Sequence, residues 1–116
     1  MAFSLVWDRN AEAVYLELRD KATASFEKRR GSGKAMSSKN EGLFTHVKKC
    51  IRLLGTNPRH PGLHTHEYSS IANPYDAKQK VFEAYAQQHT PVAYRVFWCY
   101  RPEREQITVL AITKHP

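Results

Sequence analysis

Residues 57–68, NPRHPGLHTHEY, place one arginine and three of the six histidines within eight positions. Arg59 could hold a phosphate through two parallel hydrogen bonds, and a histidine can gain or lose a proton near neutral pH. His60, His64 and His66 could also bind a transition metal, but no acid or cysteine completes a recognised ligand pattern. A third alternative is that these polar side chains are exposed and fix a turn. We expect no metal and no cofactor here.

A second set of candidate residues comes from alternation in the strand-like segments KVFEAYA and VAYRVFWCY. If the large apolar residues select one face of a sheet, then Glu83, Tyr85, Arg95 and His115 share the other face. Small residues on that face would leave room for a ligand. An acid, a base and a cation are the groups that phosphodiester cleavage requires, although sheets also often expose unrelated polar residues.

Two helices are predicted ahead of these residues. Asn10 can cap the first, in which apolar residues recur at four-residue spacing over 14–22. The second follows an apolar stripe over 43–54 and stops at Gly55. Between the two helices, residues 30–42 carry Gly, Ser and Lys without apolar periodicity, which predicts a mobile basic loop.

The remaining elements are predicted to be strands, because the apolar period becomes twofold after the turn at Asn57 and Pro58. The segments are FSLVW near the start, then HTHEYSSI, KVFEAYA, VAYRVFWCY and QITVLAI. This order predicts one α+β domain over residues 1–116, with two N-terminal helices packed on one face of a four- to five-stranded, mostly antiparallel sheet. On the last strand we expect Leu110 and Ile112 to face the helices, and Ala111, Thr113 and His115 to face away.

Positive charge is concentrated in one part of the chain. Residues 21–52 hold nine basic and two acidic side chains and account for the whole net charge of +7. On the second helix, Lys48, Lys49 and Arg52 are expected on the outward face. Such a surface would bind nucleic acid, or an acidic protein, largely through the release of counterions.

Hydropathy and cysteine content indicate where the protein is located and which chemistry it can use. The chain has no apolar run near the roughly 20 residues that a membrane helix needs, and the start, MAFSLVWDRN, does not resemble a signal peptide. Cys50 and Cys99 sit in apolar patterns and are interpreted as small buried residues, because disulfides are rare in the cytosol. We expect a soluble, cytoplasmic protein that does not bind a membrane.

The segments AYRVFW and ITVLAI with a final KHP, preceded by two helices and an NPRHPGL turn, resemble the RelE/ParE superfamily of bacterial toxins. The resemblance covers essentially the whole chain and favours the mRNA interferase branch. It implies a RelE-like fold and an endoribonuclease, a hydrolase that inhibits translation by cutting mRNA on the ribosome. That reaction would use no metal and would activate a ribose 2′-hydroxyl. The implied partners are mRNA, the ribosome and a small acidic antitoxin protein.

The resemblance also implies roles for single residues. Arg95 matches an arginine of the central strand that grips the scissile phosphate, and His115 matches a near-terminal histidine that acts as general acid or base. Glu83 and Tyr85 fall where other members have basic catalytic residues, so the general base stays open. Residues Arg59, His60 and His66 come from the region that supplies a glutamate or a lysine in certain members.

Two other functions are compatible with the same residues. A toxin of the ParE type would inhibit DNA gyrase, and an inactive relative would only bind nucleic acid or a partner protein. Histidine, arginine and glutamate in one candidate site favour nuclease chemistry over gyrase inhibition.

Overall fold

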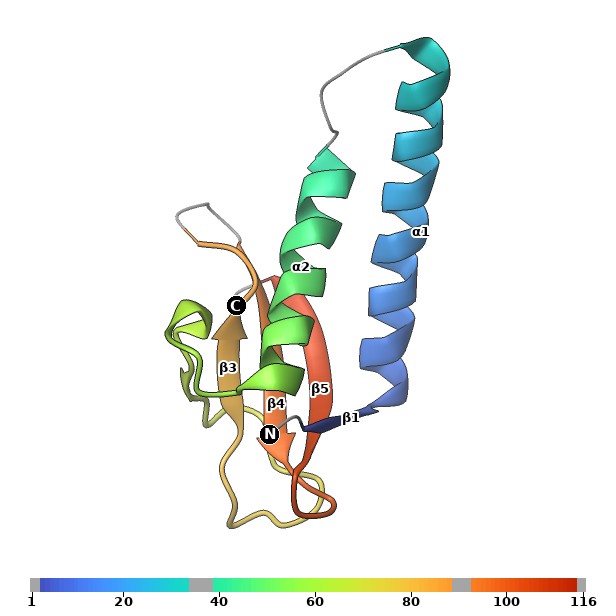
Figure 1. Ribbon diagram of the computed structural model, residues 1–116. Coiled ribbons are helices and arrows are strands. Elements are labelled where there is room, and N and C mark those ends of the chain that lie inside the picture. The colour runs from blue at the N-terminus through green and yellow to red at the C-terminus, as the bar shows by residue number, and fades with distance from the viewer. Residues whose placement is uncertain (1–2, 34–38, 89–92, 115–116) are drawn as a thin grey trace.

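The structure is a computed structural model that describes residues 3–33, 39–88 and 93–114. Two helices, α1 and α2, lie on one face of a single sheet, with α1 against β5 and α2 against β4 (Figure 1). The elements in chain order are β1 (Ser4–Trp7), α1 (Arg9–Ser32), α2 (Lys39–Thr56), the 3₁₀ turn η1 (Pro61–Leu63), β2 (His66–Glu67), β3 (Phe82–Tyr85), β4 (Tyr94–Tyr100) and β5 (Gln106–Lys114).

The sheet has five strands in the order β1-β5-β4-β3-β2. β1 runs parallel to β5, and every other neighbouring pair is antiparallel. The predicted α+β fold is therefore confirmed. β2 is much shorter than the predicted strand HTHEYSSI, because the chain pairs with β3 only at His66 and Glu67.

The core between the helices and the sheet follows the predicted alternation on β3 and β4. Ala84, Val96 and Trp98 are buried there together with Val47 and Leu54 of α2. Burial of large apolar side chains on one face of each element is what drives the two layers together. The alternate residues of β3 and β4 consequently point away from the helices.

A β-bulge on β5 changes its alternation. Phe97 pairs with Ala111, but the next residue, Trp98, pairs with Val109, so Leu110 is left as the extra residue. Val109 is fully buried in the core, whereas Leu110 is not part of it. The expectation that Leu110 faces the helices was wrong, because one inserted residue exchanges the two faces of a strand. For Ile112, beyond the bulge, the expectation is confirmed.

The first helix begins at a different cap from the predicted one. Asp8 is the N-cap, and its Oδ2 accepts hydrogen bonds from the backbone N–H of Asn10 at 2.9 Å and of Ala11 at 3.4 Å. Asn10 already lies in the first turn. Aspartate and asparagine cap helices about equally well, and the carboxylate is also favoured by the helix dipole.

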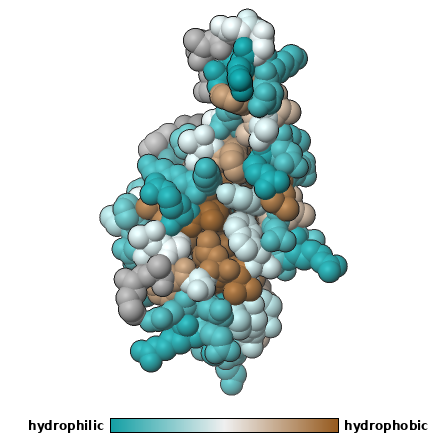
Figure 2. All heavy atoms as spheres, turned by 45° about the vertical axis from the view of Figure 1, so that its right-hand side comes forward, coloured by the Kyte–Doolittle hydropathy of each residue, from teal (hydrophilic) through white to brown (hydrophobic). Residues whose placement is uncertain are grey.

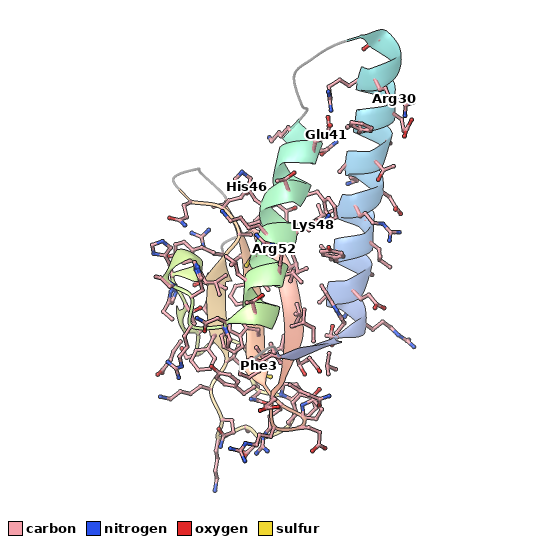
Figure 3. All side chains as sticks on the ribbon, viewed as in Figure 1. Phe3, Arg30, Glu41, His46, Lys48 and Arg52 are labelled. Atoms are coloured by element: carbon pink, nitrogen blue, oxygen red, sulfur yellow. The ribbon has the colours of Figure 1, made fainter. Side chains whose placement is uncertain are left out.

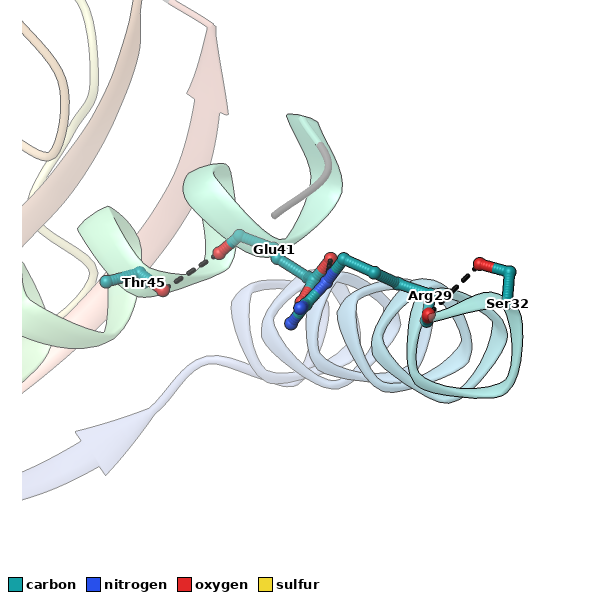
Figure 4. A network of polar contacts seen from close by, with 4 residues as sticks. All are labelled: Arg29, Ser32, Glu41 and Thr45. Carbon is teal, nitrogen blue, oxygen red and sulfur yellow. Dashed lines mark hydrogen bonds and ion pairs between the residues drawn. The ribbon is translucent and has the colours of Figure 1, made fainter. Parts of the chain in front are cut away.

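The two helices extend further than the predicted loop over 30–42 allowed. Residues 30–32 belong to α1 and residues 39–42 to α2, while residues 34–38 lie outside the described part of the chain. An ion pair joins the two ends: Arg29 Nη2 lies 2.7 Å from Glu41 Oε1 (Figure 4). These helix ends are joined by charged side chains and not by an apolar stripe. Apolar periodicity in the sequence therefore could not reveal them.

The molecule is elongated, with principal extents of 52, 26 and 25 Å. Its length comes from the helix pair, which projects beyond the sheet (Figure 1). The projecting end is largely hydrophilic on the face shown in Figure 2, and the most hydrophobic colour gathers at mid-height. None of the described helices is both long enough and apolar enough to cross a membrane.

Candidate functional site

Two rows of paired residues cross the sheet on the face away from the helices. In the first row, His66 of β2 lies opposite Glu83 of β3, and Glu83 lies opposite Phe97 of β4. In the second row, Tyr85 lies opposite Arg95. Residues directly opposite one another on antiparallel strands have side chains within contact distance. The pairing therefore assembles His66, Glu83, Tyr85 and Arg95 into one cluster.

This face is not as open as the sequence suggested, because residues 68–80 pack against part of it. The ring of Tyr68 lies 4.6 Å from that of Phe97, measured between centroids. The hydroxyl of Tyr75 lies 2.9 Å from Oγ1 of Thr108 on β5. Aromatic side chains from this segment thus occupy part of the face where small residues were expected to leave room for a ligand.

Glu83 is the centre of the cluster and is only 1% exposed. Its Oε1 lies 2.6 Å from His66 Nε2, and its Oε2 lies 3.8 Å from Arg95 Nε. A carboxylate removed from water is costly unless cations or hydrogen-bond donors replace the lost hydration. His66 and Arg95 provide that replacement, so the negative charge is held between two groups that can carry positive charge.

Arg95 is fixed from several sides and is 8% exposed. Its Nη1 donates to the carbonyl of Gln87 at 2.7 Å and to that of Tyr94 at 3.3 Å. Its Cζ lies 3.7 Å from the centre of the Tyr85 ring, which is cation–π geometry. Within the described chain its Nε has no hydrogen-bond partner. Arg95 is therefore a rigid, nearly desolvated charge under the cluster.

His66 also belongs to a groove of about 450 Å³ beside β2, which we call the histidine groove. Its lining includes Arg59, His60, His64, His66 and Phe82. All of its lining residues except Phe82 come from the NPRHPGLHTHEY stretch. Since the His66 side chain is 46% exposed and Glu83 lies behind it, His66 connects the groove with the buried cluster.

The other histidines of the groove also have structural roles. His60 is the N-cap of η1, and its Nδ1 accepts a hydrogen bond from the backbone N–H of Gly62 at 2.9 Å. His64 ends η1 in the left-handed conformation, with φ of 48°. The carbonyl of His64 lies 3.1 Å from Nδ1 of His66. The interpretation that polar side chains fix a turn is thus correct for His60, without excluding a use for its second nitrogen.

The structure therefore unites two sets that the sequence left separate. Glu83, Tyr85 and Arg95 form the cluster, and Arg59 and His60 line the adjoining groove. His66 is common to both. His115 lies outside the described residues. His64 was considered as a metal ligand or a turn residue but not as a catalytic residue, and its left-handed backbone and its contact with Tyr85 do not show in the sequence pattern.

The basic residues of α2 are all exposed but do not share one direction. Lys49 and His46 line a smaller groove of about 280 Å³ together with Tyr85. In Figure 3, His46 lies on the β3 side of α2, while Lys48 lies on the side of α1. No ion pair among the described residues involves Lys48, Lys49 or Arg52.

The described residues contain no group of three or more His, Cys, Asp or Glu side chains arranged to hold a metal ion. Cys50 and Cys99 are free and buried, as predicted. Burial raises the pKa of the Cys50 thiol to about 12 and that of Cys99 to about 11. Neither thiol is therefore a nucleophile at neutral pH.

No family model and no curated protein sequence matches this chain. Among solved structures, the YoeB dimer from Staphylococcus aureus matches with a TM-score of 0.57 and 7% identity, over 100% of both chains. A YoeB/ParE toxin from Agrobacterium tumefaciens matches with a TM-score of 0.51 and 10% identity, over 97% of this chain and 99% of that one. Both similarities span essentially the whole chain and rest on the arrangement of elements. The chain therefore shares its fold with these two proteins, YoeB and a YoeB/ParE toxin.

Proposed function

We propose that the protein is a toxin that cleaves mRNA, with the His66–Glu83 pair as its proton-transfer device. The observation that carries this proposal is an exposed histidine held at 2.6 Å by a buried carboxylate, beside a groove that contains Arg59 and His60. Acid–base catalysis by a positioned side chain typically contributes about 10²–10⁴-fold. The fold supports the proposal because toxins share it.

The reaction is an internal transfer at phosphorus. A base removes the proton of a ribose 2′-hydroxyl, the 2′-oxygen forms a bond to the adjacent phosphorus, and the bond to the 5′-oxygen breaks. The leaving 5′-oxygen then takes a proton from an acid. The products are an RNA end with a 2′,3′-cyclic phosphate and one with a free 5′-hydroxyl. Neither a metal ion nor a cofactor enters this balance.

Differences in burial support a separate role for each residue of the site. Glu83 is too deeply buried to reach RNA, so it is a positioning residue that holds Nε2 of His66. Nδ1 of the half-exposed His66 side chain would be the nitrogen that exchanges a proton with RNA, once the 2′-hydroxyl replaces its contact with the His64 carbonyl. A carboxylate that fixes one nitrogen of an imidazole while the other reacts is a recurrent catalytic arrangement.

Positive charge would stabilise the phosphate as negative charge grows on its oxygens. Arg95 supplies a rigid charge from below, and the exposed Arg59 can move onto a phosphate. His60 is available for a second contact through Nε2. In this proposal His115 protonates the leaving 5′-oxygen, as the resemblance implies, and Tyr85 holds Arg95 in place.

The proposed function also implies two kinds of partner, the ribosome and an antitoxin. The exposed lysines and arginine of α2 would concentrate the protein on ribosomal RNA, where mRNA is available. A small acidic antitoxin would neutralise the toxin in the cytoplasm.

Pulse labelling of cells after induced expression tests the proposed function. Incorporation of labelled amino acids should fall first, because translation loses its template, while DNA synthesis continues. If DNA synthesis stops first and protein synthesis continues, the protein is an inhibitor of the gyrase type and the nuclease proposal is wrong. If neither process is affected, the proposal is wrong and the domain only binds its partners.

A further inference from the structure

His64 has a backbone conformation that is unusual for a residue with a β-carbon. Its φ of 48° and ψ of 39° are left-handed, and its backbone N–H donates to the carbonyl of Pro61 at 3.2 Å to close η1. Glycine or asparagine is the ordinary choice for such a position after a helical turn. A histidine that occupies it without a backbone advantage suggests a use for the side chain.

The ring of His64 is directed onto Tyr85. The two ring centroids are 5.5 Å apart, with 35° between the ring planes. Tyr85 itself is held by the Arg95 guanidinium at 3.7 Å and meets the ring of His66 edge-on at 5.6 Å. The His64 ring therefore packs against Tyr85, which is held in place by these contacts. Tyr85 is also fixed in the sheet by its pairing with Arg95.

Unlike its support, His64 is exposed, and it lines the histidine groove with Arg59. An exposed aromatic ring on a rigid base, next to an arginine, is the arrangement by which proteins hold unpaired nucleobases and the adjoining phosphate. A metal ion is a poorer occupant, since the described residues offer no group of three ligands.

We propose that His64 is a stacking platform for one nucleobase of single-stranded RNA, with a phosphate of the same strand at Arg59. This inference rests on the proposed function and names how its substrate is held. Since every base has an aromatic face, the contact tolerates any base and selects unpaired over paired RNA. His64 would then be a binding residue that sets the base next to His66, and not a proton-transfer group.

The test is the affinity for a fluorescent single-stranded RNA with 2′-O-methyl groups, which cannot be cleaved because the attacking hydroxyl is blocked. His64→Gly and His64→Asn remove the ring but suit the left-handed backbone, so both variants should fold with unchanged or raised melting temperature. Anisotropy should show affinity lowered about tenfold or more, because stacking on one aromatic side chain has roughly that effect. His64→Trp should retain the affinity of the unmodified protein.

A second RNA, which lacks one base in the bound stretch, completes the design. The unmodified protein should bind it about as weakly as His64→Gly binds the intact strand, and His64→Gly should lose nothing further. Equal affinity of His64→Gly and the unmodified protein for the intact RNA would overturn the stacking role alone. Failure of the unmodified protein to bind any single-stranded RNA would overturn the proposed function together with it.

Discussion

Glu83 decides how the surrounding residues can act. At 1% exposure, with His66 at 2.6 Å and Arg95 at 3.8 Å, it cannot take a proton directly from RNA. It can only orient its neighbours. An exposed pair one residue along β2, Glu67 with Lys80 at 2.7 Å, has the same charges but faces solvent, where ion pairs contribute little.

Replacing Glu83 by glutamine tests this difference. Glutamine keeps the shape but removes the negative charge, so His66 loses the partner that orients it. We expect RNA cleavage to fall about 10²-fold or more, because a misplaced proton-transfer group loses most of its effect. The measurement is the single-turnover cleavage rate across pH 5–9, at a temperature where circular dichroism shows the variant folded. Glu17→Gln, which breaks the exposed Glu17–Lys21 pair of α1, is the matched control and should cleave at the normal rate. Equal rates for both variants would exclude a role for Glu83.

The two cysteines give a prediction that depends on pH. Burial raises the pKa of Cys50 from 9.0 to about 12 and that of Cys99 to about 11, so both thiols stay neutral in the folded protein at pH 8. A thiol reagent should modify neither residue in the native protein and both after denaturation. The raised pKa also means that stability should decline as the pH rises above about 9, where the unfolded thiols ionise first. Rapid modification of the native protein would show that the core opens easily.

Part of the site could be predicted residue by residue and part could not. Alternation places Glu83, Tyr85 and Arg95 on one face, and the structure brings them together. The burial of Glu83 could not be predicted, because it depends on neighbours from other segments. Residues 68–80 show no apolar periodicity, so their packing on this face could not be predicted either. The left-handed backbone of His64 follows from η1, which is also invisible to periodicity.

At the scale of elements, both helices and four of the five strands lie close to where periodicity placed them. The errors have two causes: a tie between two local preferences, and strand pairing that a single segment does not reveal. Asp8 and Asn10 are equally good caps on propensity alone. The bulge at Leu110 is set by pairing with β4 and cannot be seen in a single strand.

The prediction at the scale of elements concerns the exposed basic residues of α2. Changing Lys48, Lys49 and Arg52 to glutamine should weaken binding to ribosomes or RNA and reduce its salt dependence by about one unit of slope for each phosphate that the variant no longer neutralises. Folding should change little, since all three side chains are exposed. The measurement is affinity between about 50 and 200 mM salt, a range over which a protein with several phosphate contacts loses a large part of its affinity.

A matched control removes the same charge elsewhere. Lys78, Arg101 and Arg104 are also exposed, and they lie outside the basic span of residues 21–52. Their replacement by glutamine lowers the net charge equally and should leave the salt slope nearly unchanged. If both triple variants behave alike, binding depends on net charge and α2 has no special role.

At the scale of the whole molecule, the fold was predictable because the order of elements limits how a chain of this length can pack. Its shape was not. The projecting helix pair is held at its far end by the ion pair of Arg29 and Glu41, whose side chains are 21% and 11% exposed. Hydrogen bonding to Glu41 raises the pKa of Arg29 and so favours its charged form. The basic residues around this pair give the molecule a positive end well away from the histidine groove.

The central claim is that the histidine groove cuts RNA with its own side chains. The most direct measurement is the chemistry of the RNA ends after incubation of single-stranded RNA with the purified, untagged protein in excess chelator. We predict a 2′,3′-cyclic phosphate and a 5′-hydroxyl, a loss of about 10²-fold or more in His66→Ala, and no loss in the exposed control His46→Ala. Undiminished cleavage by a folded His66→Ala variant, or ends that carry a 3′-hydroxyl and a 5′-phosphate, would contradict this mechanism.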